Sequence, residues 1–317
     1  MSWLSRKKGP APVGDLGWEQ VRTMLRPRLV GVQVEAVRAL ALPEEVRSSA
    51  QIASAPVAGD VAVGVVVESE DGLAQVGPGL LATWGQTLAD ALDVAVASTF
   101  DRDVEIAQLV EGTYVVRDPW FAAALAQRPA MSATFEVVGD VVVVFADAGC
   151  ILVSGSQDVE GLTIVGDLLD DLVSVDEKPV SVTPLHLVDG AWQVLELPAA
   201  VAESPGWRMA VRRWTTHRAE QQAGPLAALL ASQGRDVAVA PVNLVRDTQG
   251  RALTYSAVTE GVPTAVAATD SVAHVGLDGS TRLRELADVL DGAEQLADVT
   301  PPRWVLDLGA PGDAPEA

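Results

Sequence analysis

The sequence predicts an α+β protein of two units, each a mainly antiparallel sheet with helices packed on one face. Three observations lead to this fold class. Strand-length apolar runs follow one another in pairs joined by short turn sequences, which is typical of antiparallel hairpins. Helical periodicity lies between these pairs and not after every strand, which favours an α+β layer over alternating βαβ units. A chain of 317 residues is also long for one hydrophobic core and suits two.

Four segments are expected along the chain. Residues 1–17 form a flexible basic leader rich in Gly and Pro, and residues 307–317 form a disordered tail. Residues 18–198 form an N-terminal α+β domain and residues 205–306 a C-terminal α+β domain, because the proline-bounded stretch between them interrupts both kinds of periodicity.

In the N-terminal domain, capping and turn residues set the expected boundaries. Asp118 and Pro119, for example, are typical of a helix N-cap and first helical position. In chain order we expect a helix over 18–28, strands over 61–68 and 73–76, a helix over 80–99, a helix over 120–127, a hairpin of 141–145 and 150–153, a helix over 161–173 and a hairpin of 180–188 and 192–197.

In the C-terminal domain, Ser204 and Pro205 indicate a helix start, and Pro225 and Gly234 mark the start and end of a further one. We expect helices over 206–220 and 225–233, strands over 236–245, 253–259, 264–268 and 271–275, and a helix over 281–290.

The charge distribution bears on partners and location. The net charge is −21, and residues 1–47 carry eight basic against five acidic residues, so the rest of the chain is more acidic still. Such a surface repels nucleic acid and anionic lipid, so we expect no nucleic-acid partner. The longest apolar runs have strand length, so no membrane span is expected. With no signal peptide and with Cys150 as the one cysteine, expected to be buried and inert, the protein is expected to be cytoplasmic.

One stretch resembles a known family. Residues 139–197 contain Asp140-Val141-Val142-Val143-Val144, then Cys150-Ile151-Leu152-Val153, a helix through Gly166-Asp167-Leu168, and Pro179-Val180-Ser181-Val182. With the upstream helix at Trp84-Gly85, this order resembles the C-terminal half of the YtpQ-like bacterial proteins, a family of unknown function, over about residues 60–197. The resemblance implies a fold and no activity.

Five aspartates form an acidic cluster that could hold a metal ion or act as a carboxylate pair. Asp167 and Asp171 lie four residues apart on the expected helix, so they share a face. Leucines define the opposite, buried face, which makes a solvated acidic face the simpler interpretation in a chain of this charge. The cluster is Asp147, Asp158, Asp167, Asp170 and Asp171.

Motifs for catalysis and cofactors are missing from the sequence. His186, His217 and His274 lie in different elements without a zinc-ligand spacing. A triad of Ser154 or Ser156 with His186 lacks the nucleophile elbow that would expose the serine. No glycine pattern suits a nucleotide, so no cofactor is expected.

The most unusual segment is 207–218, with four arginines and two tryptophans in twelve residues. On a helix, the tryptophans share one face and the arginines flank it. The segment is an amphipathic helix docked on the sheet, with its arginines paired to carboxylates, or a partner-binding helix, because Trp and Arg are typical interface anchors. A third interpretation is a local anion or nucleic-acid site, which the surrounding negative field opposes. The candidate interface residues are Trp207, Arg208, Arg212, Arg213 and Trp214.

The sequence therefore favours a non-enzymatic protein that acts through protein–protein contact. Two alternatives stay open: a hydrolase, with or without a metal, on the Asp167/Asp171 face or at His186, and a small-ligand sensor in the cleft between the units. Oligomeric state is not predicted.

Overall fold

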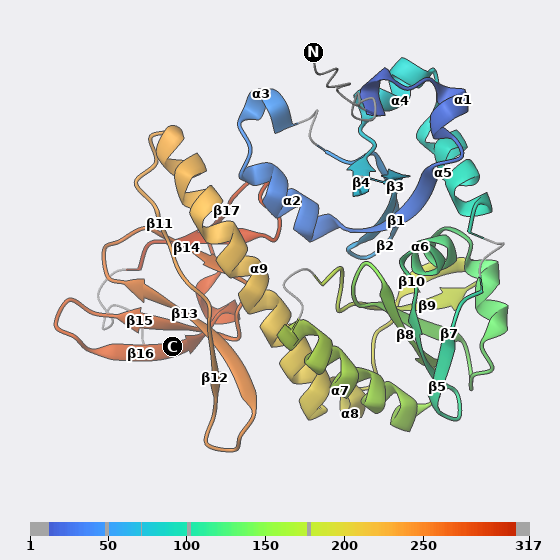
Figure 1. Cartoon of the computed structure of the whole chain (residues 1–317). Helices are drawn as coiled ribbons and strands as arrows, with labels where there is room; N and C mark the ends of the chain where they lie inside the picture. The colour runs from blue at the N-terminus through green and yellow to red at the C-terminus, as the bar shows by residue number, and fades with distance from the viewer. Residues whose placement is uncertain (1–12, 48–50, 71, 100–102, 176–178, 309–317) are drawn as a thin grey trace, which may run out of the picture.

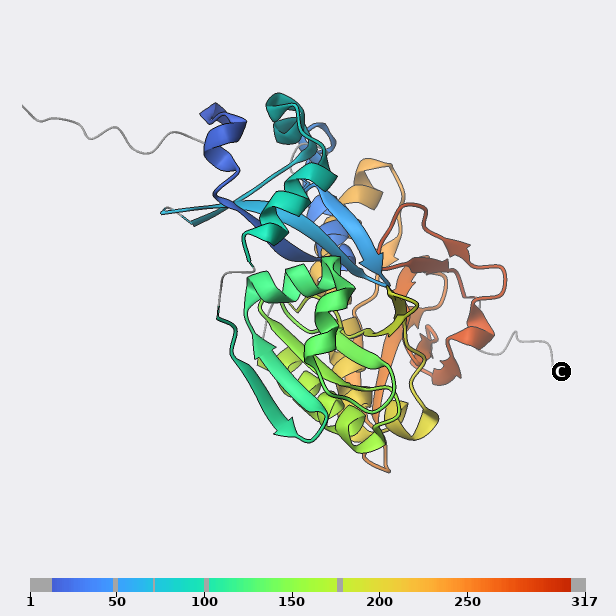
Figure 2. The same ribbon diagram turned by 90° about the vertical axis from the view of Figure 1, so that its right-hand side faces the viewer.

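The computed structural model describes residues 13–47, 51–70, 72–99, 103–175 and 179–308. The expected α+β class is confirmed, because helices accompany several sheets that are mainly antiparallel (Figures 1 and 2). Residues 1–12 of the expected leader and residues 309–317 of the expected tail lie outside the described residues.

The first sheet has the order β1-β3-β2, with β4 also paired to β3. The helix expected over 18–28 ends early, because residues 25–31 form a strand. Leu25, Pro27 and Leu29 alternate into the core, and Pro27 is tolerated because β1 is an edge strand. The elements are η1 (Val13–Asp15), α1 (Trp18–Val21), β1 (Leu25–Gly31), α2 (Val32–Leu40), α3 (Glu44–Arg47), β2 (Ser54–Ala58), β3 (Val61–Ser69) and β4 (Gly72–Gln75).

The helix expected over 80–99 is two helices, α4 (Pro78–Trp84) and α5 (Leu88–Ala97). Gly85 has a φ of 64°, a left-handed conformation that ends α4. Thr87 then caps α5, because its Oγ1 accepts a hydrogen bond from the Asp90 amide at 3.2 Å.

The second sheet is antiparallel throughout, in the order β10-β9-β7-β8-β6-β5. The hairpin expected over 141–145 and 150–153 is confirmed, and so is α6, whose first amides donate to Asp118. The hairpin expected over 180–188 and 192–197 is present with shorter strands, 184–188 and 191–194. Alternate residues of β7 and β8 face α6 on one side and α7 on the other. The elements are β5 (Ile106–Val110), β6 (Thr113–Arg117), α6 (Pro119–Gln127), η2 (Pro129–Thr134), β7 (Val141–Phe145), β8 (Cys150–Gly155), α7 (Val159–Val175), β9 (Pro184–Val188), β10 (Ala191–Val194) and α8 (Ala199–Ala202).

A single long helix, α9 (Pro205–Ser232), lies between the N-terminal sheets and the C-terminal strands (Figure 1). The prediction of two helices over 206–220 and 225–233 is wrong, because the helix continues through Pro225. Proline removes one backbone hydrogen bond there. Packing on both sides of it outweighs that cost: Trp207 is buried against α7, and Leu226 and Leu230 are buried in a C-terminal cluster.

The C-terminal strands form two sheets, β11-β14-β18-β17 and β12-β13-β15-β16, which include two parallel pairs. The strand expected over 236–245 is divided between them. The helix expected over 281–290 is wrong: residues 281–285 pair with β15 as a charged edge strand. The elements are β11 (Ala238–Val239), β12 (Asn243–Arg246), β13 (Ala252–Thr259), β14 (Thr264–Ala267), β15 (Ser271–Val275), β16 (Thr281–Glu285), η3 (Ala287–Val289), β17 (Glu294–Gln295) and β18 (Arg303–Leu306).

Candidate functional site

Both tryptophans of the 207–218 segment pack inside the fold. Trp207 is 1% exposed, and its indole Nε1–H donates to the Leu162 carbonyl of α7 at 2.7 Å. Trp214 is 5% exposed and belongs to the same core cluster. A β-carbon at Gly166 would overlap the Trp207 indole, so the glycine allows the two helices to meet this closely. A partner could contact these rings only after α9 had separated from α7.

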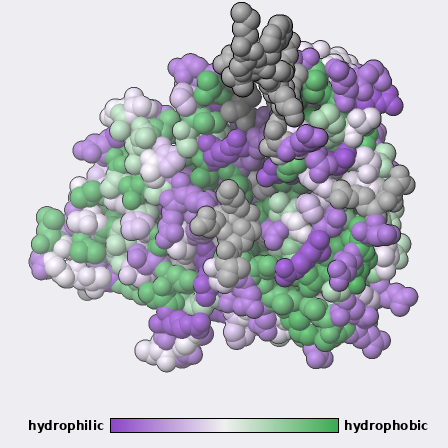
Figure 3. All heavy atoms as spheres, in the orientation of Figure 1, coloured by the Kyte–Doolittle hydropathy of each residue, from purple (hydrophilic) through white to green (hydrophobic). Residues whose placement is uncertain are grey.

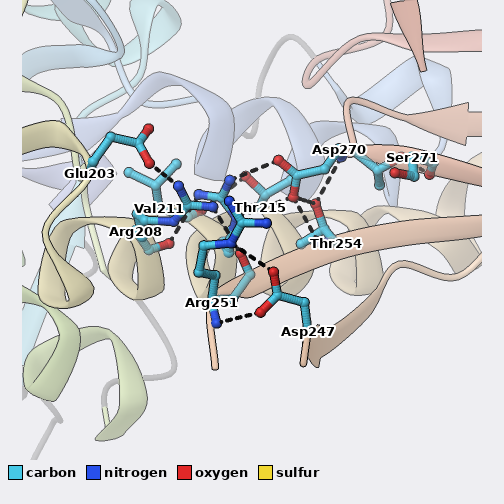
Figure 4. Close-up of polar contacts among 12 residues, drawn as sticks. Glu203, Arg208, Val211, Thr215, Asp247, Arg251, Thr254, Asp270 and Ser271 are labelled. Atoms are coloured by element: carbon cyan, nitrogen blue, oxygen red, sulfur yellow. Dashed lines mark hydrogen bonds and ion pairs between the residues drawn. The ribbon is translucent and has the colours of Figure 1, made fainter. Parts of the chain in front are cut away.

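The arginines of the segment are paired within the chain. Arg212 donates to both oxygens of Asp270, at 2.8 Å from Nη2 and 3.1 Å from Nε. Arg208 forms an ion pair with Glu203 (Figure 4). Arg213 Nε lies 2.8 Å from Asp170. This arrangement is the docked amphipathic helix, the first of the interpretations of the sequence; the interface interpretation stays a prediction.

The five aspartates of the acidic cluster have separate places. Asp147 accepts a hydrogen bond from Gly149 in the β7–β8 turn, and Asp158 accepts one from Gly161 at the start of α7. The other three line a cavity of about 380 Å³ opposite arginines of α9 and the β12–β13 turn. Burial raises the pKa of Asp170, while Arg213 opposes this shift. Within the described ranges, no three His, Cys, Asp or Glu side chains are arranged to hold a metal ion.

The residues considered for a catalytic triad are not assembled. His186 and Ser154 both lie level with Val142 in the sheet, on the strands to either side of it. They are therefore about 10 Å apart, with the Val142 side chain between them. His274 is buried on β15, far along the chain from both. Burial raises the pKa of the Cys150 thiol to about 11, with Asp147 adding to the shift, as expected of an inert thiol.

A cavity of about 760 Å³ lies between β1, α2, α9 and the β7–β8 turn. The sequence offers a cleft between the units as one alternative but names no lining residues for it, because the walls come from segments that are far apart in the chain and carry no common motif. Arg28 in particular falls inside the helix that the sequence predicted over 18–28. The polar lining residues are Arg28, Glu35, Arg38, Gln75, Asp147, Arg218 and Gln221, and the apolar ones include Val30, Val34, Val37, Ile52, Val180 and Pro225.

Three guanidinium groups reach this cavity. Arg218 is 1% exposed and stacks its guanidinium 4.4 Å from the centre of the Trp214 ring. Arg38 donates to Gln75 Oε1 at 2.8 Å and lies 3.5 Å from Glu35. Gln221 also has a polar contact, its Nε2 lying 2.9 Å from His217 Nε2. The cavity thus brings charged and amide groups together over an apolar wall, as small-molecule sites do.

Asp270 joins α9 to the C-terminal sheet, and its titration can be tested. Burial raises the pKa of Asp270, but hydrogen bonds from Thr254 and the Arg212 guanidinium outweigh it and hold the pKa below its ordinary value. A carboxyl with a lowered pKa in the folded state stabilises the fold above its unfolded pKa of about 3.9 and loses this effect as pH falls further. We expect Asp270→Asn to lower the free energy of unfolding by about 1–3 kcal/mol at pH 7.

Urea unfolding across the acidic range checks this. The difference between wild type and Asp270→Asn is expected to shrink as the pH falls through the Asp270 pKa. If the free energy of unfolding depends on pH equally in the two proteins, titration of Asp270 does not contribute to the stability of the fold.

On the face of the molecule that Figure 3 shows, hydrophilic and hydrophobic residues are interspersed, with a larger hydrophobic area at the lower right. Among the residues described, no helix combines the length and apolar composition that crossing a bilayer requires.

No model of a known protein family, no curated protein and no solved structure matches this chain.

Proposed function

We propose that this protein binds a small molecule in the cavity between β1, α2 and α9 and acts as a sensor without catalysing a reaction. One observation carries the proposal: about 760 Å³ of space where polar groups from β1, α2, β4 and α9 converge over an apolar wall. That volume lies in the range of ordinary ligand sites.

The position of α9 supports a sensing role. The helix lines the cavity through Arg218, Gln221 and Pro225. The same helix holds the C-terminal sheets through Arg212 and Asp270 on one side and through Leu226 and Leu230 on another. A ligand that contacts α9 therefore touches the element that joins the two halves of the fold.

The other functions considered from the sequence have weaker support. The carboxylates that a hydrolase would use on α7 face arginines, as Asp170 does with Arg213. The interface hypothesis retains the outer face of α9, where Val211 is 41% exposed, while Trp207 and Trp214 are core residues. The YtpQ-like resemblance stays an expectation that adds no activity.

A thermal-shift screen tests the proposal. We expect anionic, neutral and cationic fragments to include compounds that raise the melting temperature by about 5 °C when present well above their Kd. Ala41→Trp should abolish these shifts, because Ala41 lines the cavity from an exposed position at the end of α2.

Ala89→Trp is the matched control, since Ala89 is an exposed residue of α5 that does not line the cavity. It should leave the shifts intact. A screen without stabilising compounds, or shifts that survive in Ala41→Trp, would contradict the proposed function.

A further inference from the structure

We infer that the ligand is an organic anion, a carboxylate or phosphate ester with an apolar body, whose head group pairs with the Arg28 guanidinium. The inference rests on the function proposed above and adds the chemical class of the ligand and the residue that selects it.

Arg28 is a partly buried arginine for which the described part of the chain provides no partner. Its guanidinium makes no hydrogen bond or ion pair with any residue that the structure describes. Its neighbour on the strand, Arg26, in contrast lies 2.8 Å from Glu68. A guanidinium has five N–H donors, and none of those of Arg28 is used by a described residue, so all of them are available to a ligand. The chain has a net charge of −21, so carboxylates that could pair with an arginine are abundant. Because Arg28 pairs with none that the structure describes, its donors suit an external anion.

The strand places Arg28 at the cavity. On β1, Leu25, Pro27 and Leu29 are buried, so Arg28 lies on the other face of the sheet, level with Gly64 of β3. Gly64 has no side chain, and a β-carbon there would overlap Ile52. Ile52 therefore covers the strand beside Arg28 and lines the same cavity. The charged group and an apolar surface lie next to each other.

The carboxylates that line the cavity are already engaged. Glu35 lies 3.5 Å from Arg38, and Asp147 accepts the Gly149 amide at 2.6 Å in its turn. The lining residues include three arginines against these two carboxylates, an excess of one positive charge. Buried Asp60, which does not line the cavity, interacts electrostatically with Arg218, so Arg28 carries this excess. An anion paired with Arg28 would neutralise this excess, whereas a cationic ligand would add to it.

The apolar part of the ligand is indicated by the wall of α2. Val34 and Val37 lie one helical turn apart, and Ile52, Val30 and Val180 continue the apolar lining. Burial of a hydrocarbon chain here is favourable, because it removes apolar surface of both the chain and the wall from water. An inorganic anion would leave this surface exposed.

Calorimetric titration of the full chain with simple probes tests the inference. We expect octanoate and octyl phosphate to bind, and octylamine, octanol and inorganic phosphate to bind at least about tenfold more weakly, because they lack either the charge or the chain. Whichever of the two anions binds more tightly identifies the head group.

Arg28→Gln should raise the Kd of both octyl anions at least about tenfold, since it keeps hydrogen-bonding capacity and removes the charge. Arg28→Lys should restore part of the affinity. Arg22→Gln is the matched control: the Arg22 side chain is 51% exposed at the end of α1 and does not line the cavity, so the Kd should not change. Unchanged melting temperatures of the unliganded variants will show that they are folded.

Three results would overturn the inference. Octanol or octylamine could bind as tightly as octanoate, inorganic phosphate could bind as tightly as octyl phosphate, or neither octyl anion could bind. These results would leave the proposed function intact if fragments of any charge still bind and Ala41→Trp abolishes their binding. If neither the octyl anions nor the fragments bind, the inference and the proposed function are both contradicted.

Discussion

Trp207→Ala is expected to lower the free energy of unfolding by about 3–5 kcal/mol, the range for removal of a buried tryptophan. The side chain is 1% exposed between α7 and α9, and its Nε1–H donates to Leu162. The substitution opens a cavity at the crossing and leaves a carbonyl without its donor. Urea unfolding followed by far-ultraviolet circular dichroism measures the change without depending on the missing indole.

Two further variants separate the contributions. Trp207→Phe keeps most of the apolar ring and loses the hydrogen bond, so a cost of about 1–2 kcal/mol is expected. Val211→Ala, at a position 41% exposed on the same helix, should change the stability by less than about 0.5 kcal/mol. A Trp207→Ala protein as stable as Val211→Ala would contradict the docking of α9 on α7.

Gln222→Leu is expected to cost about 3–5 kcal/mol, because it leaves a buried charge without one of its acceptors. Arg303 is 0% exposed, and its Nε donates to Gln222 Oε1 at 2.7 Å. Its other nitrogens donate to the Ala219 and Ala240 carbonyls, with no carboxylate among these partners. Burial lowers the pKa of Arg303 to about 10, so it remains charged at neutral pH.

The double variant Gln222→Leu with Arg303→Met tests whether the loss of stability comes from the unpaired charge of Arg303. Replacing both partners by apolar groups removes the buried charge, so the double variant should be more stable than Gln222→Leu alone. Arg235→Met, which removes an exposed pair with Glu294, should cost less than about 1 kcal/mol. Additive losses in the double variant would show that Arg303 and Gln222 do not act together.

Local pattern was enough for the elements whose partners are close in sequence. The 141–145 and 150–153 hairpin and the helix capped by Asp118 follow from short apolar runs and capping chemistry. Residues 25–28 and 281–285 were assigned to helices because their strand pairing is visible only in the sheet. The continuity of α9 through Pro225 likewise depends on packing at both ends, which no local propensity contains.

The candidate site was harder to predict than the fold. The 207–218 segment is unusual in composition, but three of its arginines form ion pairs within the chain, with Glu203, Asp270 and Asp170. Arg28 has an ordinary sequence context, and its importance lies in the absence of a described partner and in the walls contributed by α2 and α9. Only the three-dimensional arrangement brings these segments together.

Hydrogen–deuterium exchange with and without octanoate tests the central claim, that an organic anion binds between β1, α2 and α9. The account predicts slower exchange in peptides covering residues 28–41 and 218–225, with Arg28→Gln losing this protection and Arg22→Gln retaining it. Protection elsewhere in the chain, or none at saturating octanoate, would contradict it.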